Sequence, residues 1–558
     1  MSKYHWVIND NTELPHYRGG LLPLTLRLLA FRGIMERKQA EEFLHFEATL
    51  LSDPALLPDI EKAARRLYSA ILNNEKIVVY GDFDADGITA TAIIVQGLKK
   101  LGAKISHYLP DRFSEGYGLN LKTAESLAAQ GAKLIITVDN GISSYDEVKR
   151  LNELGVDTII TDHHSIPTQL PPALAIINPH RLQDDNFKDL AGAGVAYKFI
   201  LYFFGYFGRT KEAEEYLPLA AIGTVADIMP LVCDNRYIVE MGLRRLNENP
   251  SIGLRELIRK AGFKEGQITT ERIAWAVAPR INAAGRLKHA DFSYNLLTCL
   301  DTNEAALLAA ELERLNTQRQ EITNQYVQKA RMQATNDKLV LIFEDENCPK
   351  GVVGLVAGKL CEEYWQPAIA VNTSQELCLA SCRSIEGFNI IQAIAACRHL
   401  LERFGGHEQA AGFSIKKEKL PAFKEAIEVY AQKNLDSKER RPTLLIDALA
   451  SLEEISLAAF KEIKRLEPFG EGNPSPLFLS QDLKVLDWKL MGKGQEHMSL
   501  KISQHEHILE ATAFNMAEKL VPLVQQNLDL VYNLEINEYN GRQILRANIV
   551  DFRTTVNT

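Results

Sequence analysis

Three aspartates on alternate residues, Asp82, Asp84 and Asp86, stand in the stretch VVYGDFDADGITATAII. They follow a short apolar run and precede a helix-like one. Carboxylates this close repel each other, and without a cation several of them would have to bind protons. A divalent ion removes that conflict, so the spacing predicts a metal site at this point of the chain.

Further carboxylates and imidazoles follow in three later motifs. TVDNG contains Asp139, TDHHS contains Asp162, His163 and His164, and GTVADIMPL contains Asp227. Oxygen ligands with one or two imidazoles suit Mn²⁺ or Mg²⁺ better than a thiolate-preferring ion. Two such ions would suit the hydrolysis of a phosphate ester, because one lowers the pKa of an attacking water and both stabilise the transition-state charge.

Each of these residues also has an ordinary structural interpretation. An aspartate after a strand is common in turns and as a helix N-cap, and paired histidines in a loop are usually only polar. Taken singly, each aspartate is more often structural. The four motifs in order, each beside an expected strand end or in an apolar segment, favour the metal site.

The elements that must position these motifs alternate in type. β-branched apolar runs alternate with amphipathic stretches, which predicts a parallel sheet covered on both faces. Ligands of such sheets bind outside the carboxyl ends of the strands, where the first three motifs fall. The expected strands are Lys76–Tyr80, Ile105–Leu109, Leu134–Val138, Thr158–Thr161 and Ala173–Ile177, and the expected helices between them are Ile88–Leu101, Leu121–Gln130 and Ser144–Leu154.

The rest of the chain predicts further parts. Leu190 to about Ile268 is expected to be mostly helical, and Asn303–Ala334, without Gly or Pro, predicts one helix of roughly 45 Å that bridges two domains. A second α/β pattern follows, with strands at Leu339–Phe343, Ala368–Val371 and Leu377–Cys382 and helices at Val352–Tyr364 and Ile390–Leu400. Short strand-like runs after Arg440 predict a small β-barrel of the OB type.

The fold class is therefore α/β: a parallel-sheet domain, a long helix, a smaller α/β domain and a C-terminal barrel. The expected divisions are 1–70, a helical segment packing on the first α/β domain; 71–300, that domain; 301–335, the connector helix; 336–436, the second α/β domain; and 437–558, the barrel.

Composition leaves the binding partner open. The net charge of −9 does not indicate a nucleic-acid binder, although a local basic groove would suffice. Seven scattered cysteines indicate a reducing cytosol rather than a disulfide framework. The N-terminus lacks a signal-peptide pattern, and the longest apolar stretches contain Lys198 and Asp227. We therefore expect a cytoplasmic protein without membrane association, and a monomer.

DFDADG, VDNG, TDHH and GTVADIMPL resemble the four motifs of the DHH phosphoesterase superfamily. HYLPDRFSEGYGL, RINAAGR, GGHEQAAGF and LEPFGEGNPSPLF resemble its RecJ branch, the single-strand-specific exonucleases. The resemblance runs from about Trp6 to the C-terminus. ASCRS replaces the branch's frequent Gly-Ser-Ala-Arg-Ser but keeps Ser381 and Arg383. The resemblance implies a DHH domain, a DHHA1-type second domain and an OB-fold.

The resemblance also implies roles for the acidic residues and histidines. Asp84 would bind one ion, Asp86 the other, and Asp139 both. His163 and Asp227 would complete the shell of the second ion. Asp82 is expected to join the metal ligands, and Asp162 to orient a histidine. The implied cofactor is a pair of Mn²⁺ or Mg²⁺ ions, and the implied catalytic residues are Asp84, Asp86, Asp139, His163, His164 and Asp227.

Substrate residues are expected in a cleft between the two α/β domains. A lone surface arginine is usually only solvated, but the resemblance raises the weight of a phosphate-binding role. The expected phosphate-binding residues are Arg112, Arg280, Arg286, Ser381, Arg383 and His407. Phe113 and Tyr117 would stack on bases, or else pack in the core.

The resemblance implies that the substrate is single-stranded DNA, degraded from the 5′ end to mononucleotides in DNA repair and recombination. It also implies a single-stranded-DNA-binding protein and a helicase as partners. Polarity does not follow from residue types.

Two alternatives use the same fold. A DHH phosphodiesterase could act on short oligonucleotides or cyclic dinucleotides, but such relatives usually end after the second α/β domain. The stretch from Arg440 to Thr558 therefore favours a long polymer. A non-catalytic binding scaffold would be expected to lose metal ligands, whereas this chain keeps all four motifs.

Overall fold

The computed structural model describes residues 2–8, 14, 15, 17, 19–45, 51–182, 187, 189–334, 338–435, 441–539 and 542–555. The chain divides into two compact units. One consists of residues 52–440, and the other combines residues 1–51 with 441–558. The expected boundaries at 335–336 and 436–437 fall outside the described residues.

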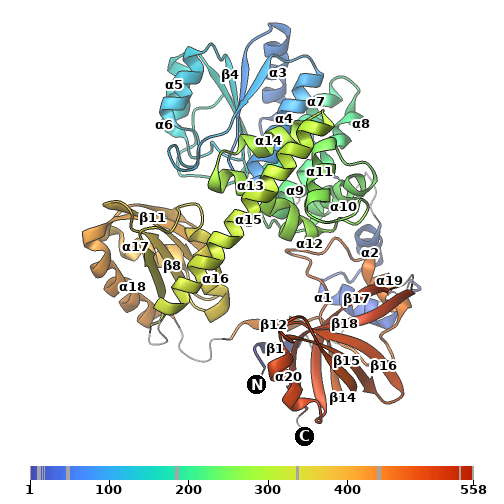
Figure 1. The fold of residues 1–558 in the computed structure, drawn as a ribbon. Helices are drawn as coiled ribbons and strands as arrows, with labels where there is room; N and C mark the ends of the chain where they lie inside the picture. Colours follow the sequence, from blue (N-terminus) through green and yellow to red (C-terminus); the bar gives the residue numbers. More distant parts are fainter. Residues whose placement is uncertain are drawn as a thin grey trace. The chain divides into compact units, whose positions relative to one another are not determined.

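The larger unit contains a five-stranded parallel sheet in the order β3–β2–β4–β5–β6 (Figure 1). Tyr80 lies beside Thr137, and Val138 lies beside Thr161, so these strands end at one common edge. Strands β2 and β4 are buried throughout, as expected for a sheet covered on both faces. The strands are β2 (Ile77–Tyr80), β3 (Ile105–Tyr108), β4 (Leu134–Val138), β5 (Asp157–Thr161) and β6 (Ala175–Ile177).

Helices cover both faces of this sheet (Figure 1). One face packs against α5 and α6 through a core that includes Leu127, Ile135 and Leu151. The other face is covered by α3, α4 and α7. The predicted parallel α/β arrangement is confirmed. The helices are α3 (Ile60–Leu72), α4 (Ala85–Lys100), α5 (Leu121–Ala129), α6 (Tyr145–Glu153) and α7 (Gly192–Gly205).

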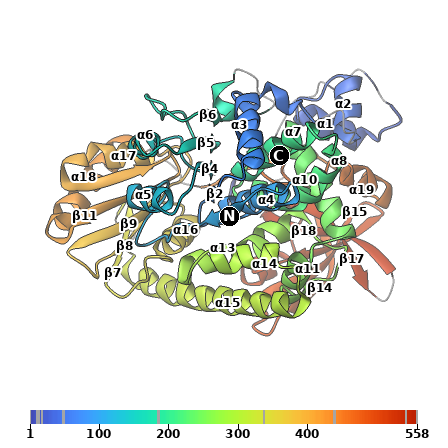
Figure 2. The same cartoon turned by 90° about the horizontal axis from the view of Figure 1, so that it is seen from above.

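A helical region and the predicted long helix follow. The helix α15 (Thr302–Gln333) packs along α13 and α14 and continues to the second α/β part (Figure 2). Among the residues described, no helix has both the length and the apolar character that a membrane crossing requires. The shorter helices are α8 (Thr210–Ala213), α9 (Leu217–Ala226), α10 (Cys233–Glu248), α11 (Ile252–Lys260), α12 (Thr270–Arg272), α13 (Ala278–Leu287) and α14 (Asp291–Thr298).

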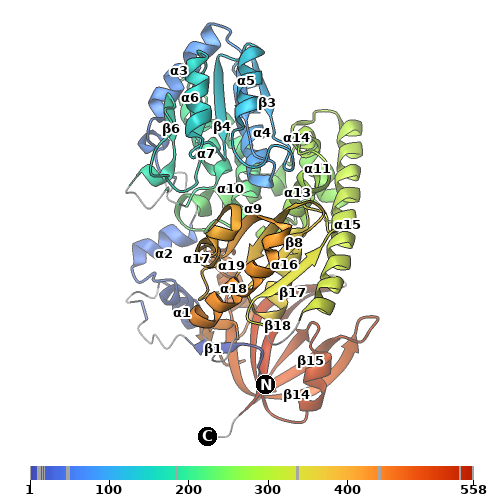
Figure 3. The same cartoon turned by 90° about the vertical axis from the view of Figure 1, so that its left-hand side faces the viewer.

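The second sheet is mixed and has the order β10–β11–β9–β8–β7. Only β7 and β8 pair in parallel. The helix α16 (Val353–Tyr364) packs on β8 and β9 beside α15 (Figure 3). The other elements are β7 (Leu341–Asp345), β8 (Ala368–Asn372), β9 (Leu377–Arg383), β10 (Leu401–Gly406), β11 (Ala410–Lys416), α17 (Ile390–Ala396) and α18 (Leu420–Asn434).

The smaller unit contains the predicted barrel. Its strands run in the order β13–β14–β15–β16–β18–β17, and a further pairing of β14 with β17 closes the sheet. Its elements are β13 (Ala448–Leu449), α19 (Leu457–Lys464), β14 (Phe478–Met491), β15 (His497–Gln504), β16 (His507–Ala513), α20 (Ala517–Leu520), β17 (Leu528–Tyr539) and β18 (Arg542–Thr554).

The N-terminal segment departs from the expectation that residues 1–70 pack on the first α/β domain. β1 (His5–Ile8) pairs in parallel with β12 (Thr443–Ile446), and α1 (Pro23–Phe31) contributes Leu24, Leu28 and Leu29 to the barrel core. The helix α2 (Arg37–Leu44) adds Ala40 to that core. Among the described helices of this segment, α3 is the one that packs on the parallel sheet. An amphipathic pattern shows that a helix buries one face, but it does not identify the partner.

Candidate metal centre and active site

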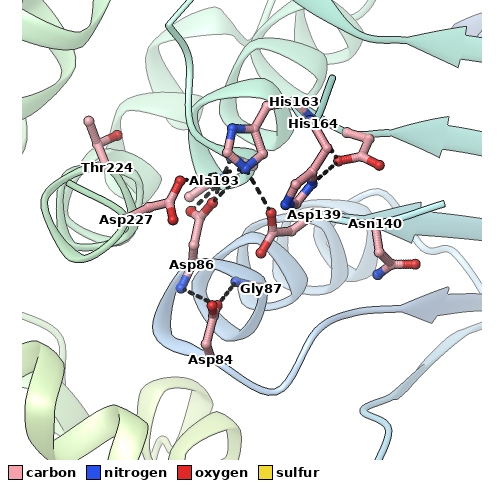
Figure 4. A network of polar contacts seen from close by, with 12 residues as sticks. Asp84, Asp86, Gly87, Asp139, Asn140, His163, His164, Ala193, Thr224 and Asp227 are labelled. Atoms are coloured by element: carbon pink, nitrogen blue, oxygen red, sulfur yellow. Dashed lines mark hydrogen bonds and ion pairs between the residues drawn. The ribbon is translucent and has the colours of Figure 1, made fainter. Parts of the chain in front are cut away.

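Acidic residues and histidines of the four motifs meet at the carboxyl edge of the parallel sheet. Figure 4 shows six of them: Asp84, Asp86, Asp139, His163, His164 and Asp227. Asp84 and Asp86 lie at the start of α4, directly after β2. Asp139 follows β4, His163 follows β5, and Asp227 lies at the end of α9. Three buried strands and two helix ends thus deliver these side chains to one place.

The candidate ligand atoms fall into three groups, and within each group all atoms lie within 4.8 Å of one another. Two of these groups share no residue: Asp82 with Asp84 and Asp139, and Asp86 with His163 and Asp227. The third group, Asp139 with His163 and His164, overlaps both. The groups are linked because His163 Nε2 lies 3.1 Å from Asp139 Oδ1. His163 Nε2 is also 3.5 Å from Asp227 Oδ2 and 3.9 Å from Asp86 Oδ2.

Helix N-termini hold two of the carboxylates. Oδ1 of Asp84 accepts hydrogen bonds of 3.1 Å from the backbone N–H groups of Asp86 and Gly87, and so caps α4. The carboxylate of Asp86 accepts from the N–H groups of Gly192 at 2.7 Å and Ala193 at 2.9 Å, at the start of α7. The positive end of each helix dipole favours these anions. Capping engages one oxygen of Asp84, so the N-cap and a metal ligand are compatible roles.

Burial, and then the charges of the neighbouring aspartates, raise the carboxyl pKa values. The pKa of Asp86 rises to about 7 and that of Asp227 to about 8, and those of Asp82 and Asp139 rise well above the usual range. Burial and the nearby His164 lower the pKa of His163 to about 4, so its imidazole is neutral and available as a ligand.

The donor set fits a divalent cation. Asp82 and Asp139 are each only 3% exposed, and Oδ1 of Asp82 has no hydrogen-bond partner among the described residues. Buried carboxylates without a counter-charge are costly, and a cation is the partner that removes the cost. Several carboxylates with a neutral imidazole suit Mn²⁺ or Mg²⁺.

Asp162 lies behind the cluster and is fully buried. Its Oδ1 accepts hydrogen bonds from the His163 N–H at 2.8 Å and from His164 Nδ1 at 2.7 Å, and its Oδ2 accepts from the Ile142 N–H at 2.9 Å. Burial would raise the pKa of Asp162, but the hydrogen bond and charge of His164 hold it below the usual range. Burial would lower the pKa of His164, but the hydrogen bond and the charge of Asp162 outweigh it and raise that pKa to about 9.

Four arginines form a second cluster in the same unit: Arg112, Arg286, Arg319 and Arg383. Burial, and then the nearby Arg112 and Arg319, lower the pKa of Arg286 to about 9. Within the described part of the chain, none of the four guanidinium groups forms an ion pair. Partly buried cations without an ion-pair partner make an anion-binding site, and guanidinium groups match phosphate oxygens.

Local contacts hold this arginine cluster. The guanidinium of Arg286 donates to the Gly351 carbonyl at 3.2 Å, and that of Arg383 donates to the Ser381 hydroxyl at 3.3 Å. The guanidinium of Arg112 lies 4.6 Å from the centroid of the Phe83 ring. Phe83 stands between Asp82 and Asp84 in the loop after β2. Side chains from both α/β parts therefore meet here.

Other predicted substrate residues lie differently. Arg280 is paired with Glu313 at 2.5 Å, so its charge is already balanced. His407 is exposed in the turn between β10 and β11, where its N–H donates to the Ala410 carbonyl at 2.8 Å. Phe113 is 43% exposed and Tyr117 is 54% exposed, which excludes core packing for both.

Tyr117 also reaches the carboxylate cluster. Its hydroxyl lies 3.0 Å from His164 Nδ1 and 3.4 Å from the backbone oxygen of Asp139. Tyr117 is therefore largely open to solvent, while its hydroxyl lies beside the candidate metal centre.

Sequence reasoning missed two features. Arg319 lies within a helix whose pattern carries no motif, so nothing marked it. The amides of Gly192 and Ala193 had a signal in the small residues of AGAG. A Cβ added at Gly192 would lie 2.6 Å from the Asp139 Cβ, so only glycine allows this approach.

Family models match three parts of the chain. The DHH family N-terminal domain matches residues 76–224, the DHHA1 domain matches 336–433, and the RecJ OB domain matches 446–551. These ranges coincide with the parallel-sheet part, the mixed-sheet part and the barrel. The match to the RecJ OB domain favours the exonuclease over a phosphodiesterase built of two α/β domains.

Relatives cover nearly the whole chain. The single-stranded-DNA-specific exonuclease RecJ of Bacillus subtilis is 37% identical over 99% of this chain and 71% of its own length. That of Escherichia coli is 33% identical over 97% of both chains. The crystal structure of RecJ from Thermus thermophilus in complex with Mn²⁺ has a TM-score of 0.85 at 29% identity, and it covers 100% of this chain and 80% of that chain. The complex with Mg²⁺ has a TM-score of 0.77 at 27% identity, with 100% and 79% covered. The chain therefore belongs to the RecJ family of single-stranded-DNA-specific exonucleases, hydrolases of the DHH class.

Proposed function

We propose that the protein cleaves single-stranded DNA from its 5′ end with two divalent ions, Mn²⁺ or Mg²⁺, and releases mononucleotides in DNA repair and recombination. The convergence of five other candidate ligand side chains around Asp139 carries this proposal. Relatives crystallised with Mn²⁺ and with Mg²⁺ support the choice of ion. Polarity and product rest on the resemblance to RecJ exonucleases.

The two groups of ligand atoms suggest how the ions are shared. Asp82 and Asp84 would hold one ion, and Asp86, His163 and Asp227 the other. Asp139 would contact both, because its carboxylate is within reach of both groups. When bound, the ions would activate a water and stabilise charge on the phosphate.

The surrounding residues keep this arrangement in place. The amides at the start of α7 orient Asp86, and Asp162 orients His164 and the backbone beside His163. The hydrogen bond between His164 and the Tyr117 hydroxyl holds the His164 imidazole beside the cluster, where it can donate a hydrogen bond. We assign His164 to contact with the reacting phosphate and Tyr117 to stacking on a base.

The arginine cluster would hold the DNA backbone. Arg112, Arg286 and Arg383 come from three predicted motifs, and Arg319 adds a fourth cation. Ser381 supports Arg383, and Phe113 is exposed enough to stack on a base. Arg280 would have to leave Glu313 to bind a phosphate, and His407 would reach one from its exposed turn.

The barrel would hold incoming single strand without base preference, in line with the match to the RecJ OB domain. A single-stranded-DNA-binding protein and a helicase as partners, a cytoplasmic location and a monomeric state remain predictions from the sequence.

Digestion of single- and double-stranded DNA labelled at either end, with each metal, tests this function. We expect Mn²⁺-dependent release of labelled mononucleotide from the 5′ end of single strands only. Asp139→Ala should abolish release, whereas Asp301→Ala, which removes the N-cap of α15 far along the chain, should not. Equal rates for wild type and Asp139→Ala, or release from the 3′ end first, would contradict the proposal.

A further inference from the structure

Asn235 is a buried side chain near the start of α10 that contacts two separate loops. Its Nδ2 donates to the backbone oxygen of Asp189 at 2.5 Å and to that of Pro230 at 3.0 Å. Both partners are acceptors, so only the NH₂ side of the amide can face them. One side chain thus fastens the loop ahead of α7 to the loop that follows α9.

The loop ahead of α7 holds Asp86. Asp189 is three residues before Gly192, and the N–H groups of Gly192 and Ala193 are the two backbone donors to the Asp86 carboxylate. A displacement of this loop would therefore move both donors. Asp86 would lose the partners that orient its oxygens.

The same loop also contacts two other members of the cluster. The backbone of Leu190, the residue after Asp189, lies close enough to the His163 ring to favour its protonated form. Gly192 packs so closely on Asp139 that an added Cβ would lie 2.8 Å from Asp139 Oδ1. The segment of residues 189–193 thus orients three of the candidate metal ligands at once.

The loop that follows α9 carries Asp227. Two residues separate Asp227 from Pro230, and the first of them, Ile228, has a φ of 57°, in the left-handed region. The turn closes with a hydrogen bond of 3.1 Å from the Met229 N–H to the Thr224 carbonyl. The Asn235 bond to the Pro230 oxygen anchors the far end of this turn, so it restrains where Asp227 points.

The helix α9 itself lies against the cluster. A Cβ added at Gly223 would be 2.5 Å from Asp86 Oδ1 and 2.5 Å from the Ala193 Cβ. There is no free space between α9, the start of α7 and Asp86. A change in the distance between the two loops would therefore be transmitted to the carboxylates.

We propose that Asn235 is a positioning residue for the metal centre: it sets the spacing between the segment that orients Asp86 and His163 and the turn that carries Asp227. The inference rests on the proposed metal site. Asn235 contacts neither ion nor substrate in this account and acts only through the two loops. Partners that orient metal ligands typically account for 10–100-fold in metal affinity, so the effect should be measurable on binding itself.

Asn235→Asp is the sharpest variant, because it keeps the shape and replaces the donor with an acceptor facing two carbonyl oxygens. Asn247→Asp is the matched control on the same helix. Asn247 also braces a loop, donating to the Ile268 carbonyl at 2.8 Å and accepting from the Ile268 N–H at 2.7 Å, but that loop holds none of the candidate ligands.

The experiment measures Mn²⁺ binding to the full chain by calorimetry and by the spin resonance of free Mn²⁺, without DNA. We expect Asn235→Asp to weaken Mn²⁺ binding by about 10–100-fold. Asn247→Asp should lower the melting temperature of the metal-free protein but leave Mn²⁺ affinity within about twofold, since surface-loop changes act on folding rather than on the site. Saturating Mn²⁺ should restore most of the turnover of Asn235→Asp, which a general loss of folded protein would not allow.

A folded Asn235→Asp protein with wild-type Mn²⁺ affinity would overturn the inference. If that variant does not fold, Asn235→Ser, which keeps a shorter donor, replaces it, and unchanged affinity in the serine variant would overturn the inference equally. Asp139→Ala serves as the reference for the site. Wild-type Mn²⁺ binding by Asp139→Ala would contradict the proposed metal site itself, which is a separate failure.

Discussion

The carboxylate cluster and the arginine cluster belong to the same unit but are built in different ways. Asp84 and Asp86 are held by backbone N–H groups at two helix ends, and Asp162 fixes the neighbouring histidine loop. The arginines have few such bonds and no acidic partners in the described part of the chain. The first cluster is oriented by the protein itself, whereas the second keeps its charge available for a ligand.

This difference explains what each cluster can do. Fixed ligands suit a metal ion, because the ion needs defined ligand distances and its charge offsets the repulsion between the carboxylates. Cations on long side chains suit a moving polymer, because each phosphate can be exchanged for the next. In the proposed function, chemistry would therefore depend on the rigid cluster and substrate binding on the adaptable one.

The largest expected effect is on the rigid cluster. Asp139→Ala should lower turnover by at least about 10²-fold, because the residue lies within reach of both groups of ligands and bound metal supplies several kcal/mol of charge stabilisation. Single-turnover digestion of a 5′-labelled strand measures this. Substantial activity at saturating Mn²⁺ would show that Asp139 is not shared between two ions.

A substitution at Asp84 separates its two roles. Asparagine caps helices about as well as aspartate, so Asp84→Asn should keep the free energy of unfolding within about 0.5 kcal/mol of wild type. Turnover should still fall by about tenfold or more, because the ligand charge is gone. Asp301→Asn, at another N-cap, is the control and should change neither quantity. If Asp84→Asn lost stability but kept normal turnover, Asp84 would be a helix cap and not a metal ligand.

The adaptable cluster should respond in substrate binding. Arg383→Ala should raise KM for single strands by about 10–100-fold with a smaller change in kcat, because a charge-assisted hydrogen bond contributes about 1.5–3 kcal/mol. Arg280→Ala is the comparison, since Arg280 is paired with Glu313. We expect its effect to stay below about fivefold. Equal increases in KM for Arg383→Ala and Arg280→Ala would contradict the distinction between arginines with and without an ion-pair partner.

The smallest expected effect concerns pH and the metal-free protein. An unfolded chain releases its aspartate protons near pH 4, but burial keeps the folded pKa of Asp86 at about 7 and that of Asp227 at about 8. The folded state then binds more protons between these values, so the free energy of unfolding falls as pH rises. The lowered pKa of His163 makes the free energy of unfolding rise with pH between about pH 4 and 6.5. This is the effect of one group, whereas four carboxyl groups act in the other direction.

Melting temperatures in EDTA from pH 5 to pH 8 test this slope. They should fall with pH in wild type, and less steeply in Asp227→Asn. Saturating Mn²⁺ should remove the fall, because the ion replaces the protons. Identical slopes for wild type and variant in EDTA would show that the cluster does not hold these protons.

Much of the fold was predictable because local patterns reported it. Alternating apolar runs gave the parallel sheet, and the absence of Gly and Pro gave α15 almost to the residue. The β10–β11 hairpin was missed because GGHEQAAGF has too few apolar residues to indicate a strand. The place of residues 1–51 was missed because β1 pairs with a strand more than 430 residues away.

The site divides in the same way. Asp82, Asp84 and Asp86 carry a spacing that is costly to keep ionised without a cation, so they could be found from sequence. Arg319 and Asn235 stand in helices whose patterns carry no motif, so neither has a spacing that predicts a role. Residues that orient others become visible only when their hydrogen bonds are known.

The most direct test of the central claim is anomalous diffraction from crystals of the protein grown with Mn²⁺. The account predicts two peaks at the edge of the parallel sheet, one against Asp82 and Asp84, the other against Asp86, His163 and Asp227, with Asp139 touching both. A single peak away from these side chains, or no peak at saturating Mn²⁺, would contradict it.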